Sequence, residues 1–294
     1  MSQTNFQNFL NLDPEDCEYS SARIAVLPIP YEATVTYGTG TAKGPAAIID
    51  ASAQVELYDE ELGSEPYRIG VATLDPVDVD GVAPRDLADR VAPAVEKILG
   101  DGKIPLVFGG EHSVTPAVFR AVHKRHPDAT VVQFDAHADL RAEYEGEPMS
   151  HACAMARGRE MAPAVQIGIR SISRAGAAWA ARDRLPIFFA HELHAGEGWM
   201  GRALAAVETG EVYVTIDLDC FDSSLMPSTG TPEPGGMGWY DITRFLKLLM
   251  MEKRVVGIDI VELAPQEYTR APDFLAAKLA YKCIGYLKEG GRSS

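Results

Sequence analysis

Three apolar segments of the sequence are each followed by side chains that can bind a metal ion. The segments are residues 104–108, 130–133 and 212–216, and their apolar and β-branched residues predict buried strands. The side chains that follow them are His112, Asp135, His137, Asp139, Asp217 and Asp219. Because strand side chains alternate between two faces, residues two positions apart point the same way while the backbone stays extended. The polar side chains after the second and third segments would therefore project together.

The rest of the chain alternates between predicted strands and predicted helices. Further strands are expected at residues 23–28, 68–74, 165–169, 186–189 and 255–260, and helices at residues 44–57, 85–99, 114–124, 175–184, 200–207, 240–251 and 272–287. We expect Pro93 to kink or split the second helix. The alternation predicts parallel strands with helices on both faces, and a ligand site at the carboxyl ends of the strands. We expect one domain over residues 1–294, with a flexible N-terminal segment over residues 1–20.

The composition argues against several classes of partner. The 294 residues carry 27 basic and 42 acidic side chains, a net charge of −15, which disfavours binding to nucleic acid or to anionic membranes. The four cysteines form no Cys-x-x-Cys pair, which argues against structural zinc and dithiol chemistry. The N-terminal residues do not read as a signal peptide, and no apolar run approaches transmembrane length. We therefore expect a cytoplasmic protein with reduced thiols.

The number of charges decides how many metal ions such a site would hold. Four carboxylates packed within a few ångströms would repel one another and raise their pKa values, whereas two divalent cations would neutralise them beside two uncharged imidazoles. Carboxylates shared by the two ions would hold them ~3.5–4 Å apart, as in two-metal hydrolytic sites. Oxygen-rich ligation with one imidazole per ion favours Mn²⁺, with Zn, Fe, Co and Ni left open.

Each motif alone also has a structural interpretation. Asp-x-His-x-Asp is more often a polar strand end than a metal site, His112 could be a helix-terminal residue with a structural hydrogen bond, and Asp217 could cap a helix. All three motifs follow apolar strands, at the edge of the sheet where an α/β fold places its ligand site. Their coincidence therefore favours a dinuclear metal centre.

Six motifs, in this order along the chain, resemble those of the ureohydrolase family, which comprises arginase, agmatinase and their relatives. They are Gly-Gly-Glu-His-Ser (109–113), Phe-Asp-Ala-His-Ala-Asp (134–139), Ser-His-Ala-Cys (150–153), Asp-Leu-Asp-Cys-Phe-Asp (217–222), Thr-Gly-Thr-Pro (229–232) and Gly-Ile-Asp-Ile-Val-Glu (257–262). The resemblance implies a three-layer α/β/α fold with a mostly parallel eight-stranded sheet. It also implies a pair of Mn²⁺ ions, hydrolysis of a guanidino group to urea, and assembly as a homotrimer or homohexamer.

Carried over by position, the resemblance implies how the two ions would share their ligands. One ion would be bound by His112, Asp135, Asp139 and Asp217, and the other by Asp135, His137, Asp217 and Asp219. Asp135 and Asp217 would thus bridge the ions. Two positions depart from the family pattern, because Glu111 stands where Asp is usual and Ser223 where Pro is usual. Neither departure removes a ligand.

The chemistry of such a site suggests roles for four residues. A water molecule activated by two metal ions would attack the guanidinium carbon, and Asp139 would accept a hydrogen bond from it. Glu262 would pair with the guanidinium. His151 would transfer a proton to the leaving amine, unless it is an exposed loop histidine without a role. Thr231 is expected to bind substrate together with Glu262 and His151.

The loop at residues 140–150 bears on the choice of guanidino substrate. It lacks the Asn-rich segment that the resemblance would place there for arginase, and it carries Glu143, Glu145 and Glu147. An acidic mouth would repel a carboxylate and suit a distal amine, so we expect agmatine to be cleaved to putrescine and urea. Arg141 and Arg170 leave guanidinobutyrate and arginine open. The pattern Asp-Leu-Arg…Glu-Tyr-Glu-Gly…Ser-His-Ala-Cys also resembles ureohydrolases of N-substituted agmatines, such as aminopropylagmatine.

Two functions of other classes stay open at this point. A metal-binding homologue without turnover would keep the fold, but the presence of all six ligands and of Glu262 argues against it. A two-metal phosphoesterase would need basic residues around the ions, whereas this site is surrounded by carboxylates.

Overall fold

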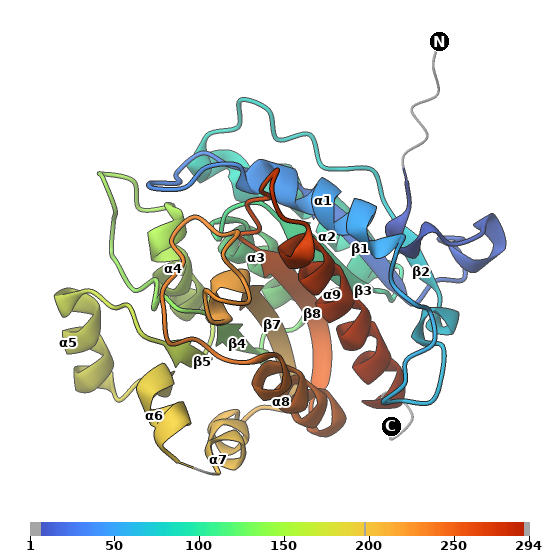
Figure 1. The fold of residues 1–294 in the computed structure, drawn as a ribbon. Coiled ribbons are helices and arrows are strands. Elements are labelled where there is room, and N and C mark those ends of the chain that lie inside the picture. Colours follow the sequence, from blue (N-terminus) through green and yellow to red (C-terminus); the bar gives the residue numbers. More distant parts are fainter. Residues whose placement is uncertain (1–6, 197, 291–294) are drawn as a thin grey trace.

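An eight-stranded sheet forms the centre of the structure (Figure 1). The computed structural model describes residues 7–196 and 198–290. The strand order is β2-β1-β3-β8-β7-β4-β5-β6, and all neighbouring strands pair in parallel. The strands are β1 (Ile24–Ile29), β2 (Val71–Thr73), β3 (Ile104–Gly109), β4 (Thr130–Phe134), β5 (Ala164–Ile169), β6 (Ile187–Phe189), β7 (Glu211–Asp217) and β8 (Arg254–Val261). The prediction of a parallel eight-stranded sheet is confirmed.

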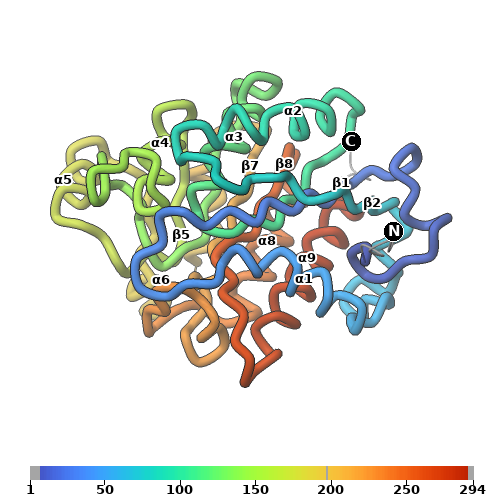
Figure 2. The backbone as a smooth tube through the Cα atoms, turned by 90° about the horizontal axis from the view of Figure 1, so that it is seen from above, coloured from blue at the N-terminus to red at the C-terminus, as the bar shows by residue number. Residues whose placement is uncertain are grey.

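Helices cover both faces of the sheet and give the predicted three layers (Figure 2). They are α1 (Gly44–Ser52), α2 (Leu87–Gly100), α3 (Val114–Arg125), α4 (Ala154–Met161), α5 (Arg174–Asp183), α6 (Ala190–Ala195), α7 (Trp199–Ala206), α8 (Trp239–Glu252) and α9 (Ala271–Gly290). Alternate residues of each central strand face opposite layers. In β1, Ile24 and Val26 pack in the core beneath α1, α8 and α9, whereas Ala25 and Leu27 pack in the core beneath α2 and α3.

The elements differ from their predicted bounds in a few places. Helices α4 and α6 were not among the predicted elements, and both are short. The strand predicted at residues 68–74 is reduced to β2, because Pro66–Ile69 forms a 3₁₀ turn. Helix α2 continues through Pro93 as one element, and its apolar face, which includes Val91 and Val95, is buried.

The expectation of a flexible segment over residues 1–20 is corrected for residues 9–12. Phe9 and Leu10 are buried, and the Phe9 ring lies 5.3 Å from that of Phe108, centroid to centroid. The Leu10 amide donates a hydrogen bond to Ser52 Oγ over 2.7 Å. Burial of apolar side chains holds this stretch against the core. The sequence did not indicate this, because most of the neighbouring residues are polar. Residues 1–6, also included in that expectation, lie outside the described residues.

The topology brings four strand ends side by side. Strands β3, β8, β7 and β4 are consecutive in the sheet, so the segments that follow them meet at its carboxyl edge. The predicted site residues therefore come from adjacent strands, although up to 150 residues separate them along the chain. Among the described helices, none is long and apolar enough to cross a membrane.

A buried ion pair ties helix α9 to the loop before β2. Lys282 Nζ lies 2.9 Å from Asp59 Oδ2 and 3.0 Å from Glu61 Oε2. The side chain of Lys282 is 4% exposed, and that of Asp59 is completely buried. A buried charge without a partner destabilises the folded state, so the Lys282 ammonium and the Asp59 carboxylate each need the other.

We predict that Lys282→Met lowers the free energy of unfolding by about 3 kcal/mol, because the Asp59 carboxylate stays buried after its cation is gone. Urea denaturation of the purified variant measures the loss. The control is Lys247→Met, which removes a cation 40% exposed that pairs with Glu61 over 2.9 Å. It should cost less than about 1 kcal/mol. Equal losses in the two variants would contradict this account.

Candidate metal centre

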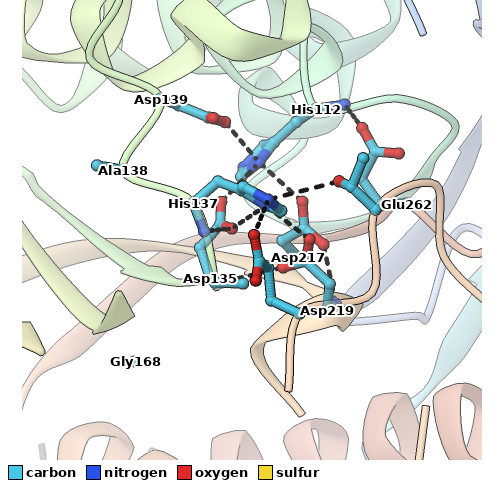
Figure 3. A network of polar contacts seen from close by, with 12 residues as sticks. His112, Asp135, His137, Ala138, Asp139, Gly168, Asp217, Asp219 and Glu262 are labelled. Carbon is cyan, nitrogen blue, oxygen red and sulfur yellow. Dashed lines mark hydrogen bonds and ion pairs between the residues drawn. The ribbon is translucent and has the colours of Figure 1, made fainter. Parts of the chain in front are cut away.

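The six predicted ligands converge at the carboxyl edge of the central strands (Figure 3). His112 follows β3, the residues at 135, 137 and 139 follow β4, and Asp217 and Asp219 stand at the end of β7. Their side chains point toward one another beside Glu262, which follows β8. The structure thus brings together all the residues predicted to bind metal.

The first cluster surrounds the imidazole of His112. Its Nδ1 atom lies 3.0 Å from Asp135 Oδ2 and 3.2 Å from both Asp139 Oδ2 and Asp217 Oδ2. Ligand atoms in an octahedral shell with metal–ligand bonds of about 2.1 Å are about 3 Å apart. The three distances from Nδ1 to these oxygens therefore match the spacing between ligands of a small divalent cation.

The second cluster shares one carboxylate with the first. His137 Nδ1 lies 2.8 Å from Asp219 Oδ2 and 3.7 Å from Asp135 Oδ1. Asp135 thus directs one oxygen to each cluster, as a bridging ligand would. Asp217 faces the first cluster with Oδ2, while its Oδ1 accepts a hydrogen bond from the Asp219 amide over 2.9 Å. A bridging role for Asp217 stays a prediction.

The backbone that carries the predicted ligands is not extended, as the sequence had suggested, but turns after the strands end. Strand β4 ends at Phe134, and Asp139 adopts a left-handed conformation with φ 49°. Asp219 lies in a 3₁₀ turn (Leu218–Cys220) whose N-cap is Asp217. Glu262 is also left-handed, with φ 68°. Such a conformation costs a residue other than glycine about 1–3 kcal/mol, and it concentrates at functional sites.

The hydrogen bonds of His112 leave its Nδ1 atom suited to a metal ion. Thr215 Oγ1 donates to the buried Asp259 carboxylate over 2.6 Å, so it has no proton left for His112 Nε2, 3.0 Å away. Nε2–H is therefore the donor in that contact, and in the neutral imidazole Nδ1 keeps its lone pair. Nδ1 is buried and makes no contact of hydrogen-bond geometry among the described residues. The donor set therefore fits a metal ion.

Burial makes two carboxylates of the clusters, Asp135 and Asp217, unfavourable as isolated anions; Asp219 differs, because His137 outweighs desolvation and lowers its pKa to about 2. Desolvation and the neighbouring charges of Asp219 and Asp139 raise the pKa of Asp135. Desolvation and the charges of Asp219 and Asp135 hold the pKa of Asp217 well above its usual range. Divalent cations would remove this repulsion and restore the charged form.

A cavity of about 220 Å³ opens above the two clusters and contains the other predicted site residues. His151, Thr231 and Glu262 all line it. Glu262 accepts a hydrogen bond from the His112 amide at Oε1 over 2.7 Å, and burial raises its pKa to about 8. Thr231 Oγ1 lies 3.5 Å from His137 Nε2. His151 faces the same space as the clusters, which sets it apart from an isolated loop histidine.

The loop that was predicted to form an acidic mouth contributes other side chains to the cavity wall. Glu143, Glu145 and Glu147 are absent from the cavity wall, to which this loop contributes Leu140, Arg141 and Tyr144. The backbone amide and carbonyl groups of Tyr144 and Glu147 pair with each other in a tight turn, which leaves the Tyr144 ring on the cavity wall. The acidic groups that line the cavity are the deeper ones, Asp139, Asp217, Asp219 and Glu262.

The two arginines considered as carboxylate receptors have different surroundings. The Arg170 guanidinium donates to backbone carbonyl oxygens of Gly168, Asp219, Phe221, Glu233 and Pro234. Its donors hold loops together, so Arg170 is not available to a substrate. Arg141 lines the cavity, with its guanidinium carbon 5.0 Å from the centre of the Tyr144 ring.

Sequence reasoning missed several residues that hold the ligands. Gln133 Nε2 donates to Asp135 Oδ2 over 2.5 Å, and Gln166 Nε2 donates to Gln133 Oε1 over 2.5 Å. Thr215 and Asp259 support His112, as described above. All four are completely buried polar residues inside apolar strands. That pattern was the available signal, because a buried polar side chain needs a partner.

The comparisons with known proteins agree with this fold. Residues 22–285 match the model of the Arginase family. The chain is 41% identical to an N(1)-aminopropylagmatine ureohydrolase of Synechocystis sp. over 93% of its length and 92% of the relative's. It is 34% identical to an agmatinase of Pyrococcus horikoshii over 93% of each chain.

A solved structure gives the same result in three dimensions. The agmatine ureohydrolase of Thermoplasma volcanium superposes with a TM-score of 0.85 and 30% sequence identity, over 94% of this chain and 93% of that one. The chain therefore belongs to the arginase family of ureohydrolases.

Proposed function

We propose that this enzyme hydrolyses the guanidino group of an agmatine-type polyamine to urea and an amine, with two Mn²⁺ ions as its cofactor. The observation that carries the proposal is the sharing of Asp135 between two His/Asp clusters at the floor of a cavity that also contains Glu262. Oxygen-rich ligation with one imidazole in each cluster supports Mn²⁺ over thiolate-seeking metals.

The proposed reaction divides the work among the residues of the cavity. Two divalent ions would lower the pKa of a water molecule and so supply a nucleophile at neutral pH. Asp139 would accept a hydrogen bond from that nucleophile. Glu262 uses only Oε1 within the described residues, so Oε2 is free to accept from the substrate's guanidinium. His151 would give a proton to the leaving amine.

The substrate's tail would lie along the cavity wall between two tyrosines. Tyr37 and Tyr144 both line the cavity, and Tyr37 is 84% exposed. Arg141 already covers the Tyr144 ring, which leaves the Tyr37 ring for a distal ammonium group. In aminopropylagmatine, which is longer than agmatine, the terminal ammonium group lies farther from the guanidino group. Together with the names of the relatives, this supports N(1)-aminopropylagmatine as the preferred substrate, ahead of agmatine.

We predict urea release from N(1)-aminopropylagmatine and agmatine in the presence of Mn²⁺. Arginine and guanidinobutyrate should be cleaved with kcat/KM about 100-fold lower, because their carboxylates would enter a cavity lined by carboxylates. A colorimetric urea assay over all four compounds measures this. No urea from any of them would refute the proposal, and a preference for arginine would instead indicate that Arg141 receives the carboxylate.

We predict that Asp135→Asn reduces Mn²⁺ content from two ions per chain to at most one, because Asp135 contributes to both clusters. Metal analysis after dialysis measures the content. The rise in Tm that Mn²⁺ gives the parent enzyme should also shrink, since bound metal no longer offsets the carboxylate repulsion. Glu233→Gln is the control, since that carboxylate lies 3.9 Å from His137 but outside both clusters. Two ions per chain in Asp135→Asn would contradict the bridging role.

We predict that Glu262→Gln lowers kcat/KM by about 10- to 100-fold with Mn²⁺ content unchanged. Glutamine keeps the oxygen that accepts from the His112 amide but loses the charge that pairs with the guanidinium, and a charge-assisted hydrogen bond contributes about 1.5–3 kcal/mol. Steady-state kinetics and metal analysis of the same preparation separate the two effects. Unchanged kcat/KM would exclude Glu262 from guanidinium binding.

A further inference from the structure

We propose that Glu111 and Thr34 are positioning residues for His151. The buried Glu111 carboxylate acts through the Thr34 hydroxyl to keep a proton on His151 Nδ1, which leaves Nε2 as the nitrogen that exchanges protons in the cavity. The inference rests on the proposed function, in which His151 gives a proton to the leaving amine.

The Glu111 carboxylate is completely buried and accepts hydrogen bonds at both oxygens. Oε2 accepts from the amides of Ala33 over 2.7 Å and Thr34 over 2.6 Å. Oε1 accepts from Thr34 Oγ1 over 2.8 Å and Ser113 Oγ over 2.5 Å. Four donors satisfy the acceptor sites of an ionised carboxylate. Glu111 therefore acts as the fixed acceptor at this end of the network.

The single proton of the Thr34 hydroxyl is committed to Glu111. Thr34 Oγ1 can then only accept from its remaining neighbours. One of these is the His151 amide, 3.0 Å away, and the other is His151 Nδ1, 3.1 Å away. Nδ1 must therefore carry a hydrogen for the second contact to be favourable. Ser150 Oγ lies 3.3 Å from the same nitrogen and can accept from it as well.

The orientation of the His151 ring is fixed on a second side. The Tyr144 ring packs against it edge to face, with centroids 6.1 Å apart and an interplanar angle of 79°. His151 Nε2 makes no hydrogen bond within the described part of the chain, and the residue lines the cavity above the two clusters. In the neutral imidazole this nitrogen keeps its lone pair, so it can take up a proton and pass it to an amine.

The network also joins three loops around the cavity. Thr34 immediately precedes the cavity-lining residues 35–38, Glu111 follows β3, and His151 ends the loop after β4. One buried carboxylate thus fixes the backbone of the first loop and the imidazole of the third. This provides the precise placement that general acid catalysis requires.

Thr34→Val tests the proposal, because it removes the hydroxyl but keeps the shape of the side chain. We expect kcat for urea release to fall by about 10- to 100-fold, part of the 10²–10⁴-fold typical of general acid–base catalysis. KM and Mn²⁺ content should change less than about threefold. Thr34→Ser, which restores the hydroxyl, should recover kcat to within about threefold of the parent enzyme.

Ser113→Ala separates a positioning role from a general loosening of Glu111. It removes another donor to the same Glu111 oxygen, and no hydrogen bond joins Ser113 to His151 among the described residues. Its kcat should stay within about threefold of the parent value. A loss in Ser113→Ala equal to that in Thr34→Val would overturn the proposal, as would full activity in Thr34→Val.

The tautomer of His151 can be measured without any substrate. In the enzyme loaded with diamagnetic Zn²⁺ and labelled with ¹⁵N-histidine, the His151 signals are assigned by their loss in His151→Asn. We expect the Nδ1–H tautomer in the parent enzyme and its depletion in Thr34→Val. The Nε2–H tautomer, with Ser150 as donor, would overturn the proposal. Failure of the parent enzyme to release urea would refute the proposed function, whereas the spectrum tests the network by itself.

Discussion

The repulsion among buried carboxylates is the constraint on which the rest of the site depends. Asp135, Asp217 and Asp219 are almost completely buried, and Asp139 is nearly so. At this depth the interaction between like charges is weakly screened, and burial itself raises the pKa of Asp135 and Asp217. Cations among the carboxylates, either divalent metal ions or protonated imidazoles, stabilise the ionised form of such a cluster.

The sheet supplies the rigidity that holds these charges together. β3, β8, β7 and β4 are adjacent, and their side chains form a core on both faces. The polar residues within these strands extend the support to the ligands. Gln133 holds Asp135, and Asp259 acts on His112 through Thr215. The left-handed backbone at Asp139 and Glu262 is tolerated because this framework over-determines it.

The sequence was most informative where chemistry and secondary structure coincide. The strands were predictable from their apolar patterns, and the convergence of the proposed metal ligands from their positions directly after those strands. The backbone geometry beyond the strand ends could not be predicted from the sequence, because it depends on the left-handed conformation of Asp139 and on the 3₁₀ turn that carries Asp219. Loop residues 143–147 were misjudged for a related reason. Their charges are visible in the sequence, but the turn between Tyr144 and Glu147 decides which side chains line the cavity.

A hydrogen-bonded chain of carboxylate, threonine and histidine occurs twice around the cavity, and it ends on a different ring nitrogen in each case. Thr215 donates to Asp259 and accepts from His112 at Nε2, which leaves Nδ1 to face the carboxylate clusters. Thr34 donates to Glu111 and accepts from His151 at Nδ1, which leaves Nε2 to face the cavity. In both, a threonine hydroxyl donates its one proton to a buried carboxylate and can then only accept from the imidazole. In the neutral imidazole, the hydroxyl in each pair thereby selects which ring nitrogen carries the hydrogen. This selection suits the metal ligand proposed at His112 and the proton carrier proposed at His151.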